Sequence, residues 1–252
     1  MSLEIIAAGF LVGTLIGLTG MGGGSLITPI MIFVFRVPPL VAVGTDLALS
    51  AITKFAGSIA HYRLGNVDTK IVRTLLFGSV PGALLGLIVL RILPFLGVGP
   101  IDGVIKNLLG GVLLVVAVSL FFPSLWKYVR RPESASGNKT RHLRLFSFGI
   151  GFIVAMTSIG SGSLMVPFLM TALTLPLSRV VGVDVVHGAA IAAVAGAGHL
   201  AAGSVDYRLL LQLLIGSVPG VLLGSRLSVL FPKRTMELVL GSMLVISGIK
   251  LL

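Results

Sequence analysis

Long apolar stretches separated by short polar turns run along the whole chain. They cover 3–36, 38–62, 69–93 and 102–122 in the first half, and 143–175, 177–201, 207–231 and 235–252 in the second. An α-helix needs roughly 20 apolar residues to cross a lipid bilayer. The pattern therefore predicts an all-α fold, a polytopic transmembrane helical bundle with four hydrophobic segments in each half.

The first segment of each half contains a glycine-rich break. Residues 20–25 read Gly-Met-Gly-Gly-Gly-Ser and residues 160–163 read Gly-Ser-Gly-Ser, and a proline follows each, Pro29 and Pro167. Glycine and proline are poor helix formers. Non-helical backbone at membrane depth is tolerated only where protein or a wet cavity covers it. We therefore predict that the two breaks are facing halves of one binding site.

The two halves are copies of one unit. Shifted by 138 residues, positions 22–86 align with 160–224 without a gap, and 24 of these 65 pairs are identical. The identities include Asp46 with Asp184 and His61 with His199, which shared hydrophobicity alone would not match. We predict a first transmembrane repeat at 1–122, a cytoplasmic basic linker at 123–142 and a second transmembrane repeat at 143–252.

Small residues recur along the third segment of each repeat. Glycines four residues apart predict helix faces that pack closely in lipid; they are Gly78, Gly82 and Gly86, and Gly216, Gly220 and Gly224. Asp68 and Asp206 stand just before these segments, where helix N-caps are expected.

Composition agrees with a membrane protein. The chain is 56% hydrophobic and only 11% charged, with a mean hydropathy of +1.10. Its net charge of +11 would indicate nucleic acid in a soluble chain, but six of the nineteen basic residues lie within 123–144. Basic loops of membrane proteins face the cytoplasm. There is no cysteine, which excludes disulfides and thiolate metal sites.

The membrane topology stays open at this stage. If each first segment crosses once, the N-terminus is cytoplasmic, but Arg226, Lys233 and Arg234 then fall outside. If each first segment is a re-entrant hairpin, the number of crossings is odd and the repeats are inverted.

A helix that begins after a glycine-rich break offers free N–H groups and a positive dipole end to an anion. Lys54 would add a charge within the membrane, where a lysine is costly and seldom without a role. It is expected either to attract an anionic substrate or to neutralise Asp46 or Asp184, and its counterpart in the second repeat is Ala192. The candidate substrate-binding residues are Gly22, Gly23, Gly24, Ser25, Thr53, Lys54, Gly160, Ser161, Gly162 and Ser163.

Two acids and two histidines are candidates for proton or ion coupling: Asp46, Asp184, His61 and His199. The alternative is structural, with the acids bonded to backbone amides of the opposing break and the histidines at the membrane interface. His187 has no counterpart in the first repeat and is expected to be incidental. No His/Asp spacing of one helical turn repeats, so we expect no metal site.

Several short motifs carry a family resemblance. They are Val-Gly-Thr-Asp-Leu at 43–47, Ala-Ile-Thr-Lys at 51–54, Gly-Asn-Val-Asp at 65–68, Gly-Ser-Val-Pro-Gly at 78–82 and Ala-Gly-Ala-Gly-His-Leu at 195–200. With the glycine breaks, they resemble the TauE/SafE sulfite-exporter family over nearly the whole chain. The resemblance implies a multi-pass transporter of the bacterial or archaeal cell (inner) membrane. Its substrates would be sulfite, sulfonates, thiosulfate or related sulfur-containing anions.

The sequence thus favours a secondary transporter, with the two repeats rocking about a central anion site, and not an enzyme. Expected partners are a small anionic substrate and the lipid bilayer, without nucleic acid or cofactor; a homo-oligomer is left open. An anion channel is the nearest alternative. An intramembrane aspartyl protease using Asp46 and Asp184 is disfavoured, because Thr45 and Val183 stand where its signature needs glycine.

Overall fold

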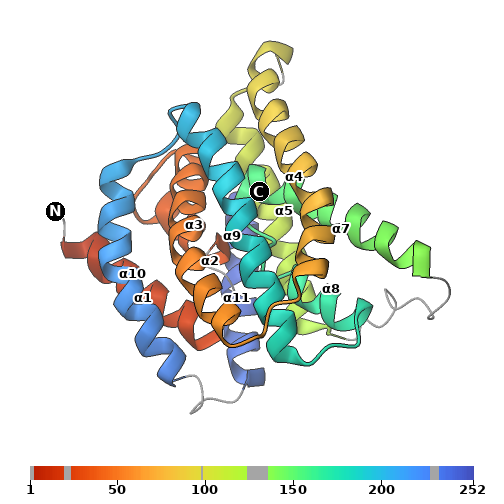
Figure 1. The fold of residues 1–252 in the computed structure, drawn as a ribbon. Helices are drawn as coiled ribbons and strands as arrows, with labels where there is room; N and C mark the ends of the chain where they lie inside the picture. The colour runs from red at the N-terminus through yellow and green to blue at the C-terminus, as the bar shows by residue number, and fades with distance from the viewer. Residues whose placement is uncertain (1–2, 20–23, 98, 124–135, 228–232) are drawn as a thin grey trace.

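The computed structural model describes residues 3–19, 24–97, 99–123, 136–227 and 233–252. The secondary structure of these residues is entirely helical, which confirms the predicted class (Figure 1). The helices are α1 (Leu3–Thr19), α2 (Gly24–Phe33), α3 (Pro39–Arg63), α4 (Thr69–Ile92), the 3-10 helix η1 (Leu93–Leu96), α5 (Ile101–Phe121), α7 (Ser136–Thr157), α8 (Met165–Ala172), α9 (Leu177–Ala201), α10 (Tyr207–Leu227) and α11 (Lys233–Leu251). Among the described residues, five spans are long and apolar enough to cross a membrane: α3, α4 with η1, α5, α9 and α10.

Helix α7 begins earlier than the hydrophobic pattern predicts. It starts at Ser136, inside the predicted linker 123–142, while residues 124–135 lie outside the described residues. The apolar pattern fails here because the first turns of α7 carry polar and basic residues, among them Lys139 and Arg141.

An aspartate stands just before α4, and another stands just before α10. Asp68 accepts hydrogen bonds from the backbone N–H groups of Lys70 and Ile71 at the start of α4. Asp206 accepts one from Leu209 at the start of α10. Each satisfies amides that have no partner within the helix, so the predicted N-caps are confirmed.

Glycines bring α4 against α7. Gly78 of α4 faces the carbonyl oxygen of Arg144 on α7. Two turns later Gly86 faces that of Phe152, so the two helices run in the same direction. A Cβ at Gly82, between them, would lie 2.0 Å from a carbonyl oxygen of α7, a distance that only glycine allows. The predicted packing face is therefore confirmed on α4.

The same arrangement joins α10 to α1, which lie side by side in Figure 1. Gly216 faces the carbonyl oxygen of Ile6, and Gly224 faces that of Thr14. These two helices also run in the same direction, and small residues again let two backbones meet closely.

In the centre, α3 and α9 run in opposite directions. Gly44, near the start of α3, faces the carbonyl oxygen of Ser204, just after the end of α9. Gly182, near the start of α9, faces that of Asn66, just after the end of α3. Helices α5 and α11 are antiparallel too, because Gly110 lies against Gly248 while Gly241 lies against Phe121.

These directions show how the broken segments fold. Helix α4 returns antiparallel to α3 after the turn at 64–68, so α4, α7 and α9 all run the same way. The chain between α7 and α9 must therefore travel back, and the short helix α8 lies on this return path. By the same argument α2 lies on the return path between α1 and α3.

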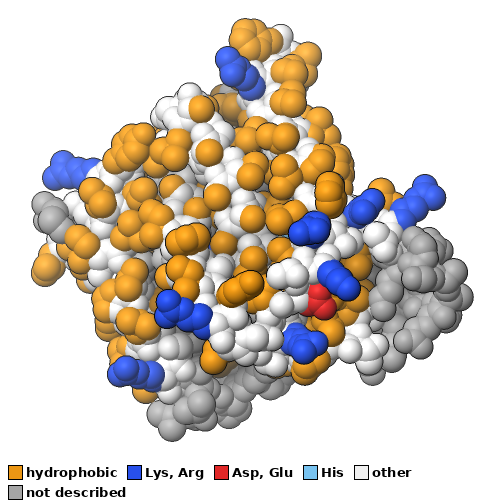
Figure 2. Space-filling view, in the orientation of Figure 1, with side chains coloured by type: hydrophobic (Ala, Val, Ile, Leu, Met, Phe, Trp, Pro, Cys, Tyr) orange, Lys and Arg blue, Asp and Glu red, His pale blue; other side chains and the backbone are white. Residues whose placement is uncertain are grey.

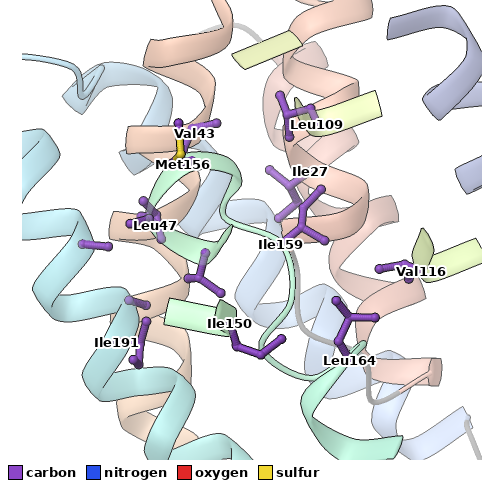
Figure 3. Packing of buried hydrophobic residues seen from close by; sticks show 14 of the residues in the cluster. Ile27, Val43, Leu47, Leu109, Val116, Ile150, Met156, Ile159, Leu164 and Ile191 are labelled. Carbon is purple, nitrogen blue, oxygen red and sulfur yellow. The ribbon is translucent and has the colours of Figure 1, made fainter. Parts of the chain in front are cut away.

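The second break lies within the hydrophobic core. Residues 154–160 and 162–165 are all buried. Ile159 and Leu164 of this segment belong to the same buried cluster as Ile27 of α2, Val43 of α3 and Leu109 of α5 (Figure 3). Protein rather than lipid covers this broken backbone, as predicted for non-helical chain at membrane depth.

Candidate functional site

The second break, residues 158–164, has backbone angles that ordinary side chains avoid. Gly160 and Gly162 have φ values of +125° and +89°, and Ser158 has a φ of +60°. Glycine takes such angles without a steric penalty, whereas serine does so at some cost. The sequence Gly-Ser-Gly therefore ends α7 and lets the chain turn back into α8.

Several backbone amides in and beside this break already have partners. The N–H groups of Leu164 and Met165 both donate to the carbonyl oxygen of Gly160, at 3.2 Å. The Gly162 N–H donates to Oδ1 of Asp184 on α9, at 3.0 Å. The carboxylate of Asp184 thus takes an amide that the sequence assigned to substrate. This matches the structural alternative for the acids, although the amide comes from the break of the same half and not the opposing one.

Lys54 reaches from the first half of the chain to the second break. Its Nζ donates to Oγ of Ser161 at 2.6 Å. Gly188 of α9 makes room for it, because a Cβ there would lie 2.7 Å from Nζ. The ammonium interacts electrostatically with Asp184 and, more weakly, with Asp46. One cation therefore interacts electrostatically with both predicted acids and donates to a hydroxyl of the break.

Asp46 is fully buried and has different partners from Asp184. Thr28 of α2 donates its hydroxyl to Oδ2 of Asp46 at 2.7 Å. Among the described residues, Oδ1 of Asp46 has no hydrogen-bond partner. Ser158 lies beside this carboxylate, and its hydroxyl also lacks a partner among the described residues. The first acid is therefore held by one hydroxyl and has capacity for a further donor or cation.

The two predicted histidines have different surroundings. His199 is buried, and its Nε2 lies 2.9 Å from the carbonyl oxygen of Ala155 on α7, to which it can donate. His61 is half-buried near the end of α3. Of these two histidines, His199 is therefore the one that bonds to α7, the helix that leads into the second break.

The remaining candidates from the sequence are spread around this centre. Thr53 donates its hydroxyl to the carbonyl oxygen of Leu49 on its own helix, not to the site. Ser25 and Ser163 are buried, and Oγ of Ser163 has no partner among the described residues. Gly24 is the first residue of α2, and Gly22 and Gly23 lie outside the described residues.

Comparison with known proteins gives the family. The family described as "Sulfite exporter TauE/SafE" matches residues 5–251. The chain belongs to this family. TauE/SafE relatives include the probable membrane transporter protein YjnA of Bacillus subtilis, 39% identical over 256 residues that cover all of both chains. A more distant one is MJ0441 of Methanocaldococcus jannaschii, 29% identical over 72% of this chain and 66% of its own. No solved structure matches the chain.

Membership of the TauE/SafE family makes the chain a multi-pass membrane transporter and not an enzyme. Its relatives are bacterial and archaeal. The protease interpretation is therefore set aside. Among the described residues, no group of three or more His, Cys, Asp or Glu side chains could hold a metal ion.

Sequence reasoning missed three residues of this candidate site. Thr28 lies three residues after Ser25, and His187 and Gly188 lie three and four residues after Asp184. These spacings place each on the same helix face as a residue already chosen. His187, expected to be incidental, is fully buried, with Nε2 2.9 Å from Oγ of Ser79. Helical spacing was thus the signal that could have found them.

Proposed function

We propose that this TauE/SafE protein is a secondary transporter of small sulfur-containing anions such as sulfite, sulfonates or thiosulfate. The supporting observation is the contact between Lys54 and Ser161, which joins a cation of one half to the broken backbone of the other. An oxyanion there would receive a charge-assisted hydrogen bond from Lys54 and a second hydrogen bond from Ser161. The substrate class follows the family description.

Asp184 would couple this binding to an ion. It is the stronger electrostatic partner of Lys54 and accepts the Gly162 amide, so it competes with an anionic substrate for both donors. A proton on Asp184 would free Lys54 and the amide for the substrate. Asp46 would take a proton or cation through its unpartnered oxygen, and His61 and His199 remain further candidates.

We infer that residues 1–122 and 143–252 are inverted repeats. Helices α3 and α9, which correspond at an offset of 138, run in opposite directions. Gly110 and Gly248 are also 138 positions apart, and they face each other. This fits a pseudo-two-fold axis that relates the repeats and passes between α5 and α11. Each first segment would then be a re-entrant hairpin. Inverted repeats that meet at a midplane site give alternating access when one rocks against the other.

The helix directions also suggest which face is cytoplasmic. The end of the bundle that leads into the linker has ten basic residues in or beside its helix ends: Arg63, Lys70, Arg73, Lys139, Arg141, Arg144, Arg179, Arg226, Lys233 and Arg234. The other end has five: Arg36, Arg91, Lys106, Arg208 and Lys250. In Figure 2 basic side chains gather around the turn from α3 to α4, at the first of these ends. By the positive-inside rule that end is cytoplasmic.

This orientation differs from the one obtained with four crossings per half. The N-terminus moves to the outside, and Arg226, Lys233 and Arg234 join the linker on the inside. The difference arises because each hairpin returns to the side where it began. This moves the N-terminus to the outside and reverses α9, α10 and α11, while α3, α4 and α5 keep their directions.

Flux through the purified protein in proteoliposomes tests the function. A panel of sulfite, thiosulfate, a sulfonate and a carboxylate would be supplied on either side, with and without a proton or sodium gradient. Saturable, gradient-coupled flux of a sulfur-containing anion supports the proposal. Unsaturable flux driven by voltage alone would instead show a channel, and the absence of flux for every sulfur anion would refute the substrate class.

A further inference from the structure

A groove between α4 and α7 combines an apolar floor with two arginines. Its volume is about 350 Å³, and it is lined chiefly by Phe77 of α4 and by Thr140, Arg141, Arg144, Leu145 and Phe148 of α7. The side chains of Phe77 and Leu145 are 64% and 60% exposed. In a membrane-spanning bundle such exposed apolar side chains face lipid, so the groove opens to the bilayer.

Arg144 is exposed and lies at the polar end of the apolar segment that begins at residue 143. It is in the third turn of α7, eight residues after the first residue, Ser136. Its guanidinium lies over the ring of Phe77, 5.5 Å from the centroid. Arg141 is exposed one turn earlier, and none of the described residues lining the groove is acidic. Arginines at this end of a membrane-spanning helix suit an anionic headgroup of the adjacent leaflet.

The corresponding groove in the other half has no charge. It lies between α1 and α10, where Leu3 and Ile6 stand 138 positions before Arg141 and Arg144. Its lining is apolar throughout, including Phe10, Ile215 and Pro219. The helix crossing itself therefore does not require arginines. Arg141 and Arg144 distinguish the groove near the linker from the groove at the opposite end of the bundle.

We propose that the α4–α7 groove binds an anionic phospholipid of the cytoplasmic leaflet. The planar guanidinium groups of Arg141 and Arg144 would hold the headgroup phosphate, a ligand that arginine can bind through two parallel hydrogen bonds. The acyl chains would lie along Phe77, Leu145 and Phe148. Basic grooves between transmembrane helices on the cytoplasmic side suit anionic headgroups. Only the choice of leaflet rests on the orientation proposed above.

Native mass spectrometry of the purified full chain tests this directly. The protein in mild detergent would be titrated with phosphatidylglycerol and, separately, with phosphatidylcholine of the same acyl chains. The wild type should retain one phosphatidylglycerol more tightly than any phosphatidylcholine. The Arg141→Gln/Arg144→Gln variant should bind that lipid about 30-fold more weakly, because each arginine beside an anionic headgroup contributes a factor of about five.

A matched control removes the same charge elsewhere. Arg179→Gln/Arg226→Gln alters two exposed arginines at the same end of the bundle and should leave lipid retention unchanged. Arg141→Lys/Arg144→Lys, which keeps the charges, should retain part of the affinity and shows whether a folded groove still binds. Equal losses in both glutamine variants, or no loss in the groove variant, would overturn the proposal. Displacement of the lipid by glycerol phosphate alone would overturn it too, because the site would then serve a soluble phosphate.

Discussion

The two halves of this transporter share a frame but not a site. Gly13 and Gly151, 138 residues apart, each face a serine carbonyl oxygen so closely that a Cβ would lie 2.4 Å and 2.0 Å from it. The equivalent acids behave differently. Asp46 accepts a hydrogen bond from the hydroxyl of Thr28. Asp184 accepts one from the backbone N–H of Gly162 in the break, and it has the stronger electrostatic interaction with Lys54.

The contrast shows which positions must match in the two halves and which can differ. At the glycine crossings two backbones meet, and any added atom would push a helix away, so both halves need the same residue. The acids have no such steric requirement, only a need for hydrogen-bond or charge partners. One lysine can therefore serve both half-sites, provided that α3 and α9 lie against each other.

The largest expected effect concerns whether the two halves are inverted in the membrane. The readout is cysteine labelling, which should be all-or-none. The chain has no cysteine, so single cysteines can be placed at Leu64 and Ala202, equivalent exposed positions after α3 and α9. An impermeant maleimide added to intact cells should label Ala202→Cys and not Leu64→Cys. After the membrane is opened, both should react. Ser136→Cys, at the start of α7, should behave like Leu64→Cys.

The same labelling result for both turns in intact cells would mean that the halves are parallel, and the inverted-repeat proposal would fail. External labelling of Ser136→Cys would place the linker outside and reverse the proposed orientation.

The next largest effect is expected from Lys54, the source of the asymmetry. Lys54→Met keeps the aliphatic bulk and removes the charge. Anion flux in proteoliposomes should fall about 100-fold, because a desolvated charge pair loses a few kcal/mol when one partner is truncated. The protein should also lose about 3–5 kcal/mol of stability, since Asp184 remains buried without its cation.

A double variant separates these two roles. Lys54→Met/Asp184→Asn removes the unpaired carboxylate and should restore most of the thermal stability, while flux stays low if Lys54 contacts the substrate. Recovery of both stability and flux would show that Lys54 only balances the acid. Wild-type flux in Lys54→Met would end the substrate-contact proposal.

A smaller and equal effect is expected at the glycine crossings. Gly82→Ala and Gly220→Ala place a Cβ 2.0 Å and 2.3 Å from a carbonyl oxygen of the facing helix. Each should cost about 1–3 kcal/mol of stability, as overpacking does. Gly149→Ala is the control, because nothing lies within 4 Å of its Cβ. Thermal unfolding should show it unchanged or slightly stabilised; clearly unequal losses at the two crossings would mean that the frame is not shared.

The smallest effect is expected at Thr28. Thr28→Val removes the donor to Asp46 at nearly constant volume and should destabilise the protein by about 1 kcal/mol, since one carboxylate oxygen loses its bond. The equivalent position in the second half is already Val166, so Val166→Thr should change the melting temperature little. If Thr28→Val melts like the wild type, Asp46 does not depend on this bond.

Local features of the frame could be predicted from the sequence because they depend on nearby residues. The length of the apolar stretches predicted the membrane helices. Asp68 caps α4 because an aspartate before a helix reaches its first amides. The glycines at 78, 82 and 86 indicated a packing face through their spacing alone. The start of α7 was missed because its first turns are polar.

The site was predicted only in outline. Lys54, Asp184 and the second break were chosen as separate candidates, and Thr28 and His187 were missed because neither forms a recognisable pair in the repeat. The partner of Lys54 could not be found by spacing, because Ser161 lies 107 residues away on another element.

The sequence by itself determined that the protein is a bundle of membrane helices, because hydrophobic length is a property of the linear chain. The 138-residue offset predicted a duplication with a glycine-rich break in each half, and the short motifs carried the resemblance to a transporter family. Only the tertiary structure decided that α3 and α9 run in opposite directions and that one lysine serves the second break. Both depend on how helices far apart in the sequence pack, and the packing is fixed by backbone contacts at glycines such as Gly44 and Gly182. A glycine in the sequence shows that another helix can pack closely there. It does not show which helix that is, or whether the two helices run parallel or antiparallel.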